Sequence, residues 1–251
     1  MPTNTQDPVI GLIVPPAAGE VPPEPPALYP QGLRFVARGL GLQKLSFDDY
    51  GQAVERVRDI AKALVEEDDA QAICLMGTSL SFFRGGLFNE ELVAMLQDAT
   101  GKPATTMSNA VCEALNALGA RRVAVGTAYS DDVNARLAEF LTKRGFDVCA
   151  MEGMGLVEVR DVHDVTPDQV TELGRRAAKA AAGAVDAVLV SCGGLPALHL
   201  ADALEDELGL PVVASSTAGA WGAVRLLGHS GAAPALGRLG RVAGSEQTVT
   251  A

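Results

Sequence analysis

Cys192 is the residue whose chemical type and place in the sequence point most clearly to catalysis. It lies in the segment Ser-Cys-Gly-Gly, directly after an apolar run that predicts a buried strand. A thiol at a strand end can act as a nucleophile, as a proton donor or, once ionised, as a base. The two glycines that follow allow backbone N–H groups to approach an anion closely. The alternative is a small buried cysteine beside a tight turn.

Hydroxyl groups follow two other predicted strands. The turn Gly77-Thr78-Ser79 offers hydroxyl and N–H groups that could bind a carboxylate, although Ser and Thr at such positions commonly only cap the next helix. Tyr129 could donate a hydrogen bond to an anion, or could simply pack at a helix start. Asp131 is expected to be a helix cap or a first-turn acid.

Other catalytic motifs are missing from the sequence. The three histidines are far apart, and there is no P-loop, no GxSxG motif and no GxGxxG after a strand. The four cysteines, at positions 74, 112, 149 and 192, form no CxxC pair and no cluster with zinc spacing. We therefore expect no metal site, and we expect a reduced, cytoplasmic compartment.

The composition excludes several classes of partner. The 251 residues are 48% apolar and carry a formal net charge of −11. An acidic chain without a basic tract matches nucleic acid poorly, because phosphates require clustered Lys and Arg. No stretch approaches the ~20 apolar residues of a membrane span, and the first residues show no signal-peptide pattern. We expect no nucleic-acid or membrane partner, and a monomer with a dimer as the alternative.

The elements that position these residues alternate between strands and helices. Short apolar runs predict strands at 9–14, 71–76, 103–107, 122–126, 186–190 and 211–214. Helical patterns are found at 48–67, 88–99, 109–118, 131–144, 166–182, 197–208 and 218–227. Residues 15–30 contain seven prolines and predict a long loop, and the residues after Gly228 predict a loosely held tail. The alternation predicts parallel sheet covered on both faces, with ligands beyond the carboxyl ends of the strands.

An internal repeat divides this pattern into two similar parts. Leu-Met-Gly-Thr-Ser-Leu (75–80) and Val-Ser-Cys-Gly-Gly-Leu (190–195) each end a strand and precede a helix. A Gly-x-Pro, a short strand and then a serine, Ser108 or Ser216, follow in both parts. Two such halves would face each other across a cleft, with Gly77 and Cys192 as counterparts.

Four long motifs resemble the arylmalonate decarboxylases, within the aspartate/glutamate racemase superfamily. They are GLIVPPAAG (11–19), LMGTSLSFFRG (75–85), TAYSDDVNARL (127–137) and LVSCGG (189–194). The resemblance implies an α/β fold of two similar halves related by a pseudo-twofold axis. Each half has a mainly parallel four-stranded sheet flanked by helices, and the active site lies in the cleft between them. The expected halves are residues 9–118 with 217–240, and residues 119–216, with tails at 1–8 and 241–251.

The same resemblance implies a reaction and the residues that carry it. Racemases of the superfamily place one cysteine in each half, whereas here Gly77 stands at the first position and Cys192 remains. The expected reaction is cofactor-independent decarboxylation of α-aryl or α-alkenyl malonates, in which Cys192 protonates an enediolate on one face. Thr78, Ser79 and Tyr129, with backbone N–H groups near Ser79, Cys192 and Gly193, would form the dioxyanion hole. The remaining substrate-binding residues would be Pro16, Leu42, Tyr50, Leu80 and Val157 in an apolar wall, and Gly77 and Gly194 beside the aryl group.

Two other functions stay open at this point. One is a racemase or isomerase of a small dicarboxylate or amino acid, which would need a second acid or base near Gly77. The other is a non-catalytic carboxylate-binding protein. If Cys192 is the acid of a decarboxylase, it should rest as a thiol, with a normal or raised pKa.

Overall fold

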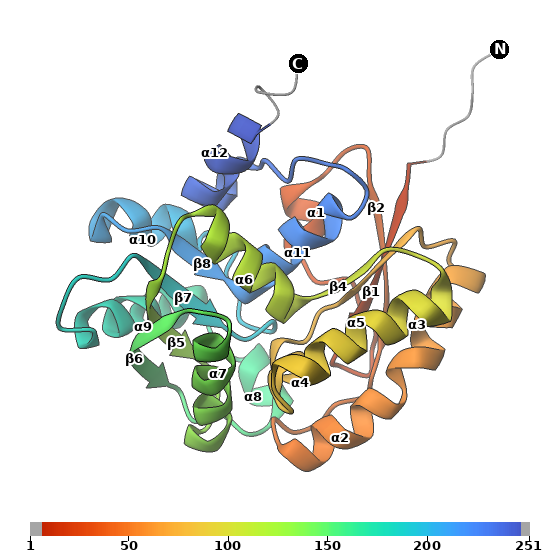
Figure 1. Cartoon of the computed structure of the whole chain (residues 1–251), viewed down its shortest axis with the longest axis horizontal. Helices are drawn as coiled ribbons and strands as arrows, with labels where there is room; N and C mark the ends of the chain where they lie inside the picture. The colour runs from red at the N-terminus through yellow and green to blue at the C-terminus, as the bar shows by residue number, and fades with distance from the viewer. Residues whose placement is uncertain (1–6, 247–251) are drawn as a thin grey trace.

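The computed structural model describes residues 7–246 and contains two four-stranded sheets (Figure 1). The strand order is β2-β1-β3-β4 in the first sheet and β6-β5-β7-β8 in the second, and all neighbouring strands are parallel. The two sheets therefore have the same order, which agrees with the repeat read from the sequence. The predicted fold class, two four-stranded parallel sheets flanked by helices, is confirmed.

The elements have the following bounds. The strands are β1 (Val9–Val14), β2 (Arg34–Gly39), β3 (Ala72–Leu75), β4 (Ala104–Thr106), β5 (Arg122–Thr127), β6 (Asp147–Gly153), β7 (Ala187–Ser191) and β8 (Val212–Ala214). The helices are α1 (Glu24–Leu28), α2 (Phe47–Glu55), α3 (Val57–Glu66), α4 (Thr78–Phe82), α5 (Gly86–Thr100), α6 (Met107–Ala117), α7 (Asp131–Lys143), α8 (Val159–His163), α9 (Pro167–Ala180), α10 (Leu200–Leu208), α11 (Ser215–Arg225) and α12 (Gly237–Glu246), with a 3-10 turn at η1 (Pro234–Leu236).

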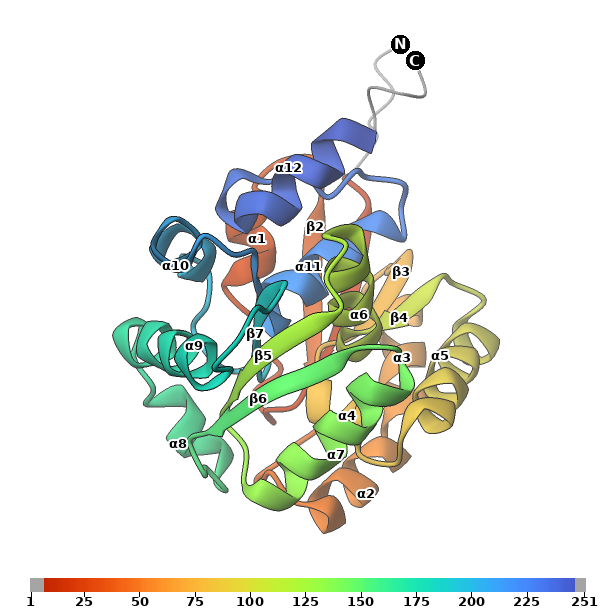
Figure 2. The same ribbon diagram turned by 60° about the vertical axis from the view of Figure 1, so that its left-hand side comes forward.

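The inner strands of both sheets are buried, apart from Arg122 at the start of β5. Every residue of β1, β3 and β7 is buried, because helices cover both faces of a parallel sheet. Helices α6 and α11 pack against each other and both contact β4 and β8, so they join the two sheets (Figures 1 and 2). One hydrophobic core runs through both halves and includes Ile73 of the first sheet and Val125 of the second.

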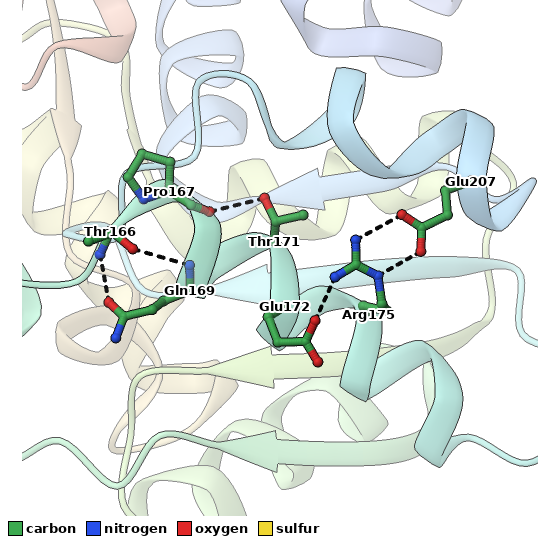
Figure 3. Close-up of polar contacts among 7 residues, drawn as sticks. All are labelled: Thr166, Pro167, Gln169, Thr171, Glu172, Arg175 and Glu207. Atoms are coloured by element: carbon green, nitrogen blue, oxygen red, sulfur yellow. Dashed lines mark hydrogen bonds and ion pairs between the residues drawn. The ribbon is translucent and has the colours of Figure 1, made fainter.

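Helix α9 begins with the cap that its sequence predicts. The Thr166 hydroxyl accepts a hydrogen bond from the Gln169 N–H, and the Gln169 side chain accepts one from the Thr166 N–H (Figure 3). Further along the helix, the Arg175 guanidinium pairs with Glu207 at 2.6 and 2.9 Å and so connects α9 to α10. No helix within residues 7–246 is long and apolar enough to cross a membrane.

Three expectations about elements are wrong, and two strands were missed. The helix predicted over 48–67 is interrupted at Arg56 into α2 and α3, and the loop predicted over 15–30 contains the short helix α1. Strands β2 and β6 were not predicted, because they lack the fully buried run that the other two edge strands, β4 and β8, possess. The tail expected after Gly228 is ordered as far as it is described: Leu236 and Leu239 are buried and α12 continues to Glu246.

The boundaries of the two halves stay a prediction. The strands of the first sheet come from residues 9–106 and those of the second from residues 122–214. Helix α11, just beyond the second set, contacts strands of both sheets. Residues 1–6 and 247–251 lie outside the described residues, so most of the predicted tail 1–8 and the end of the tail 241–251 are not described.

Candidate active site

A cavity of about 610 Å³ opens where strands of both sheets end. Its wall includes Val14 at the end of β1 and the turns that follow β3, β5 and β7. These turns contribute Met76, Gly77, Thr78, Ser79, Tyr129, Cys192, Gly193 and Gly194. The structure therefore brings together the residues from both halves to which the sequence assigned chemistry.

Cys192 follows β7 directly, and its side chain is buried. Burial raises the pKa of the thiol, because a thiolate is poorly solvated there. The N–H groups of Gly194 and Leu195 and the hydroxyl of Tyr129 act in the opposite direction but do not cancel the effect of burial. The residue thus rests as a thiol, and the same three groups can stabilise a transient thiolate.

Tyr129 is buried beside Cys192, two residues after the end of β5. Its backbone is held by the Thr127 hydroxyl, which accepts from the Tyr129 N–H at 3.2 Å, and by Asn134, which donates to the Tyr129 carbonyl at 3.3 Å. Burial raises the pKa of the phenol well above its usual value, and the neighbouring Cys192 raises it further. The hydroxyl is therefore protonated and available as a donor toward an anion in the cavity.

Thr78 and Ser79 form the first turn of α4 and do not cap it. The N-cap is Gly77, with extended backbone, and no side chain supplies a cap hydrogen bond. The Thr78 hydroxyl instead donates to the Met107 sulfur at 2.9 Å. Ser108 fixes the turn by donating to the Thr78 carbonyl at 3.0 Å. Capping, the alternative role weighed for these hydroxyls, is thus not what the structure shows.

The predicted apolar wall is only partly found at the cavity. Pro16 and Leu42 line it, whereas Tyr50, Leu80 and Val157 do not. Leu80 is fully buried beneath Gly77: a Cβ built on Gly77 would lie 2.6 Å from Leu80 Cδ1. Val157 is 45% exposed.

Tyr50 lies just behind the lining. It is fully buried, edge-on to Phe83, and its hydroxyl has no hydrogen-bond partner among the described residues. Burial raises the pKa of this phenol, and Ser79 and Cys192 both lie close enough to influence it. Tyr50 is therefore a neutral phenol near Ser79 and Cys192 rather than an exposed part of the wall.

Residues 43–45 and 157–159, which come from different halves, pair at the cavity and form part of its wall. The Leu45 N–H donates to the Val157 carbonyl at 2.7 Å, and the Val159 N–H donates to the Gln43 carbonyl at 2.8 Å. This antiparallel contact places Leu45 and Val159 in the lining. Val162, on the same short helix as Val159, lines the cavity as well.

Sequence reasoning missed several groups in this cavity, among them Val159, Val162 and Glu24. Val159 and Val162 carried no signal, because their position depends on pairing with residues far away in the chain. Glu24 was hidden in the proline-rich segment; it lines the cavity, is 3% exposed, and accepts a hydrogen bond from the Ala197 N–H at 3.5 Å. Burial raises its pKa. Within the described residues, no group of three His, Cys, Asp or Glu side chains is placed to hold a metal.

Comparison with known proteins identifies a family. The family model described as arylmalonate decarboxylase matches residues 10–240. The arylmalonate decarboxylase of Bordetella bronchiseptica is 47% identical over 233 residues, which cover 92% of this chain and 96% of that protein.

Solved structures agree with this match. A doubly substituted variant of arylmalonate decarboxylase in a liganded form superposes with a TM-score of 0.88 at 46% identity, over 92% of this chain and 98% of that one. The maleate cis-trans isomerase of Nocardia farcinica has a TM-score of 0.84 at 23% identity, over 93% of this chain and 98% of that one, and so shares the fold.

Proposed function

Because the chain belongs to the arylmalonate decarboxylase family and is a carboxy-lyase, we propose that it decarboxylates α-aryl or α-alkenyl malonates without a cofactor. The products would be CO₂ and a chiral monocarboxylic acid. The observation that carries the proposal is the pairing of turns at the cavity. Of the described residues, Cys192 is the one cysteine in the lining, and Gly77 stands in the turn of the other half.

The carboxylate that stays on the substrate is held by donors from both halves. The hydroxyls of Thr78, Ser79 and Tyr129 supply one set, and backbone N–H groups near Ser79, Cys192 and Gly193 supply the other. When the C–C bond to the other carboxylate breaks, its electron pair passes into this carboxyl group and forms an enediolate. Donors fixed in advance stabilise charge where it develops, which is the largest catalytic contribution in many enzymes.

The departing carboxylate faces the apolar part of the cavity wall. Pro16, Leu42, Leu45 and Val159 line this part of the cavity, and no lysine or arginine is found among its lining residues in the described chain. An ionised carboxylate is poorly solvated in such surroundings, and leaving as neutral CO₂ relieves that cost. Tyr50 and Leu80 support the wall from behind.

Protonation completes the reaction. The Cys192 thiol transfers its proton to the α-carbon, which yields the monocarboxylate and a thiolate. The N–H groups of Gly194 and Leu195 stabilise the thiolate until it regains a proton from water. One thiol reaches one face of the planar enediolate, so a single enantiomer is expected. A racemase would need a second acid or base on the other face, where Gly77 offers none.

The test is turnover of phenylmalonate and 2-methyl-2-phenylmalonate by purified, chelator-treated protein. We expect CO₂ release and one enantiomer of 2-phenylpropionate by chiral chromatography. Solvent deuterium exchange into aspartate, glutamate and maleate is measured in parallel. No CO₂ release, together with exchange into one of these three compounds, would identify a racemase or isomerase instead. Binding heat with a malonate but no turnover would identify a carboxylate-binding protein.

A further inference from the structure

Met107 lies between the two anion-holding turns. It is the first residue of α6 and is completely buried. Its sulfur accepts the hydrogen bond of the Thr78 hydroxyl at 2.9 Å. On the other side, a Cβ built on Gly193 would lie 2.9 Å from both the sulfur and the terminal methyl of Met107. The thioether therefore touches a turn of the first half and a turn of the second half at once.

The thioether is also confined from a third direction. A Cβ built on Gly219 of α11 would lie 3.1 Å from the Met107 methyl and 3.0 Å from the Met76 sulfur. With glycines on two sides and Thr78 on the third, the end of the Met107 side chain is closely packed on three sides. A close-packed group of this kind transmits any change in its volume to its neighbours.

The chemistry of the sulfur suits a group that orients a hydroxyl without retaining it. A thioether is a weak hydrogen-bond acceptor, whereas hydrogen bonds to a carboxylate are about twice as strong as neutral ones. The Thr78 hydroxyl can therefore leave the sulfur and donate to a substrate carboxylate instead, because the new hydrogen bond is the stronger one. An amide or carboxylate in the place of Met107 would compete with the substrate for the same hydroxyl.

We propose that Met107 is a positioning residue that sets the separation of the Thr78 and Gly193 turns and keeps the Thr78 hydroxyl available for the substrate carboxylate. This inference rests on the proposed function of those turns. Met107 contacts the groups that would hold the substrate, and it acts through them. The volume of the Met107 side chain and the weakness of its sulfur as a hydrogen-bond acceptor are separate properties. Different substitutions therefore test them separately.

The experiment compares Met107→Leu, Met107→Gln and Met107→Ala with the wild type. Two quantities are measured: kcat/KM for phenylmalonate, and Kd for phenylacetate, an unreactive carboxylate, by calorimetry. Leucine keeps most of the volume, so both quantities should stay within about threefold. Glutamine should weaken phenylacetate binding about tenfold by competing for Thr78. Alanine should lower kcat/KM by roughly 10–100-fold, because the turns lose their spacing.

Leu96→Ala is the matched structural control. Leu96 is completely buried on α5 and does not line the cavity, so its truncation should lower the melting temperature without changing kcat/KM. Thr78→Val tests whether Met107 acts through that hydroxyl: the binding penalty of Met107→Gln should disappear in the Thr78→Val background.

The proposal is overturned if Gln and Leu variants bind phenylacetate equally well, or if Met107→Ala loses no more activity than Leu96→Ala. If Met107→Ala does not fold, the comparison of Gln with Leu decides alone. If the wild type releases no CO₂ from phenylmalonate, the proposed reaction fails, and phenylacetate binding still tests the role of Met107.

Discussion

Replacing Gly77 with cysteine adds a second thiol at the counterpart of Cys192. The backbone at Gly77 is extended, so a side chain introduces no backbone strain. A new Cβ would, however, lie 2.6 Å from Leu80 Cδ1 and 3.2 Å from Leu80 Cβ. Leu80 is fully buried and must shift, and overpacking of this kind costs about 1–3 kcal/mol. We therefore expect a folded variant with a lowered melting temperature.

The functional expectation for Gly77→Cys is racemisation. Two thiols on the two faces of an enediolate supply the acid and the base that deprotonation and reprotonation need. The assay incubates one enantiomer of 2-phenylpropionate with the variant in D₂O. Chiral chromatography then follows the second enantiomer, and mass spectrometry follows α-deuterium. The racemisation rate of the variant should exceed that of the wild type, while its decarboxylation rate falls. Adding Leu80→Val to Gly77→Cys should restore part of the lost stability, because it removes the methyl group that the new Cβ contacts.

One result would refute this reasoning. If Gly77→Cys has an intact fold by circular dichroism and calorimetry, yet racemises at the background rate, Gly77 does not face the α-carbon. The lack of a second thiol at position 77 would then not explain why the enzyme decarboxylates rather than racemises.

Three further predictions concern other residues of the cavity. Tyr129→Phe should lower kcat/KM for phenylmalonate about 100-fold with little change in melting temperature, because one fixed donor to the enediolate is lost. Since burial raises the pKa of Cys192, kcat/KM should be constant through neutral pH and fall only above the ordinary thiol range; a decline that begins near pH 6 would contradict this. Burial also raises the pKa of Glu24, so the folded chain binds this proton more tightly than the unfolded chain, and the stabilisation present at low pH is lost as pH rises through the raised pKa. Glu24→Gln should therefore raise the melting temperature more at pH 8 than at pH 5, as calorimetry at the two values would show.

Much of the fold could be predicted from the sequence because six of the eight described strands are buried along nearly their whole length. Such strands appear as short apolar runs, and all six predicted strands exist within a residue or two of their expected bounds. The edge strands β2 and β6 are partly exposed and carry no such run. Helix α12 depends on a distant contact, since the buried carboxylate of Glu205 accepts from the Arg238 N–H at 2.9 Å. A local pattern does not reveal a partner of this kind.

The candidate site could be predicted where it follows strand ends and not where it depends on contacts between the halves. Cys192, Thr78 and Tyr129 come after buried strands, and parallel topology brings these ends to one cavity. By contrast, the choice between Val157 and Val159 as a wall residue is made by the pairing of 43–45 with 157–159. Two residues along the chain separate the exposed side chain of Val157 from that of Val159, which lines the cavity.

The central claim is that the Cys192 thiol delivers the proton, and Cys192→Ala tests it most directly. The measurement is the rate of CO₂ release from 2-methyl-2-phenylmalonate, together with the enantiomer ratio of the 2-phenylpropionate formed. A positioned proton donor contributes typically 10²–10⁴-fold, so the rate should fall by about that factor and residual product should be racemic. A folded Cys192→Ala protein that releases CO₂ at the wild-type rate, and still gives a single enantiomer, would contradict the account.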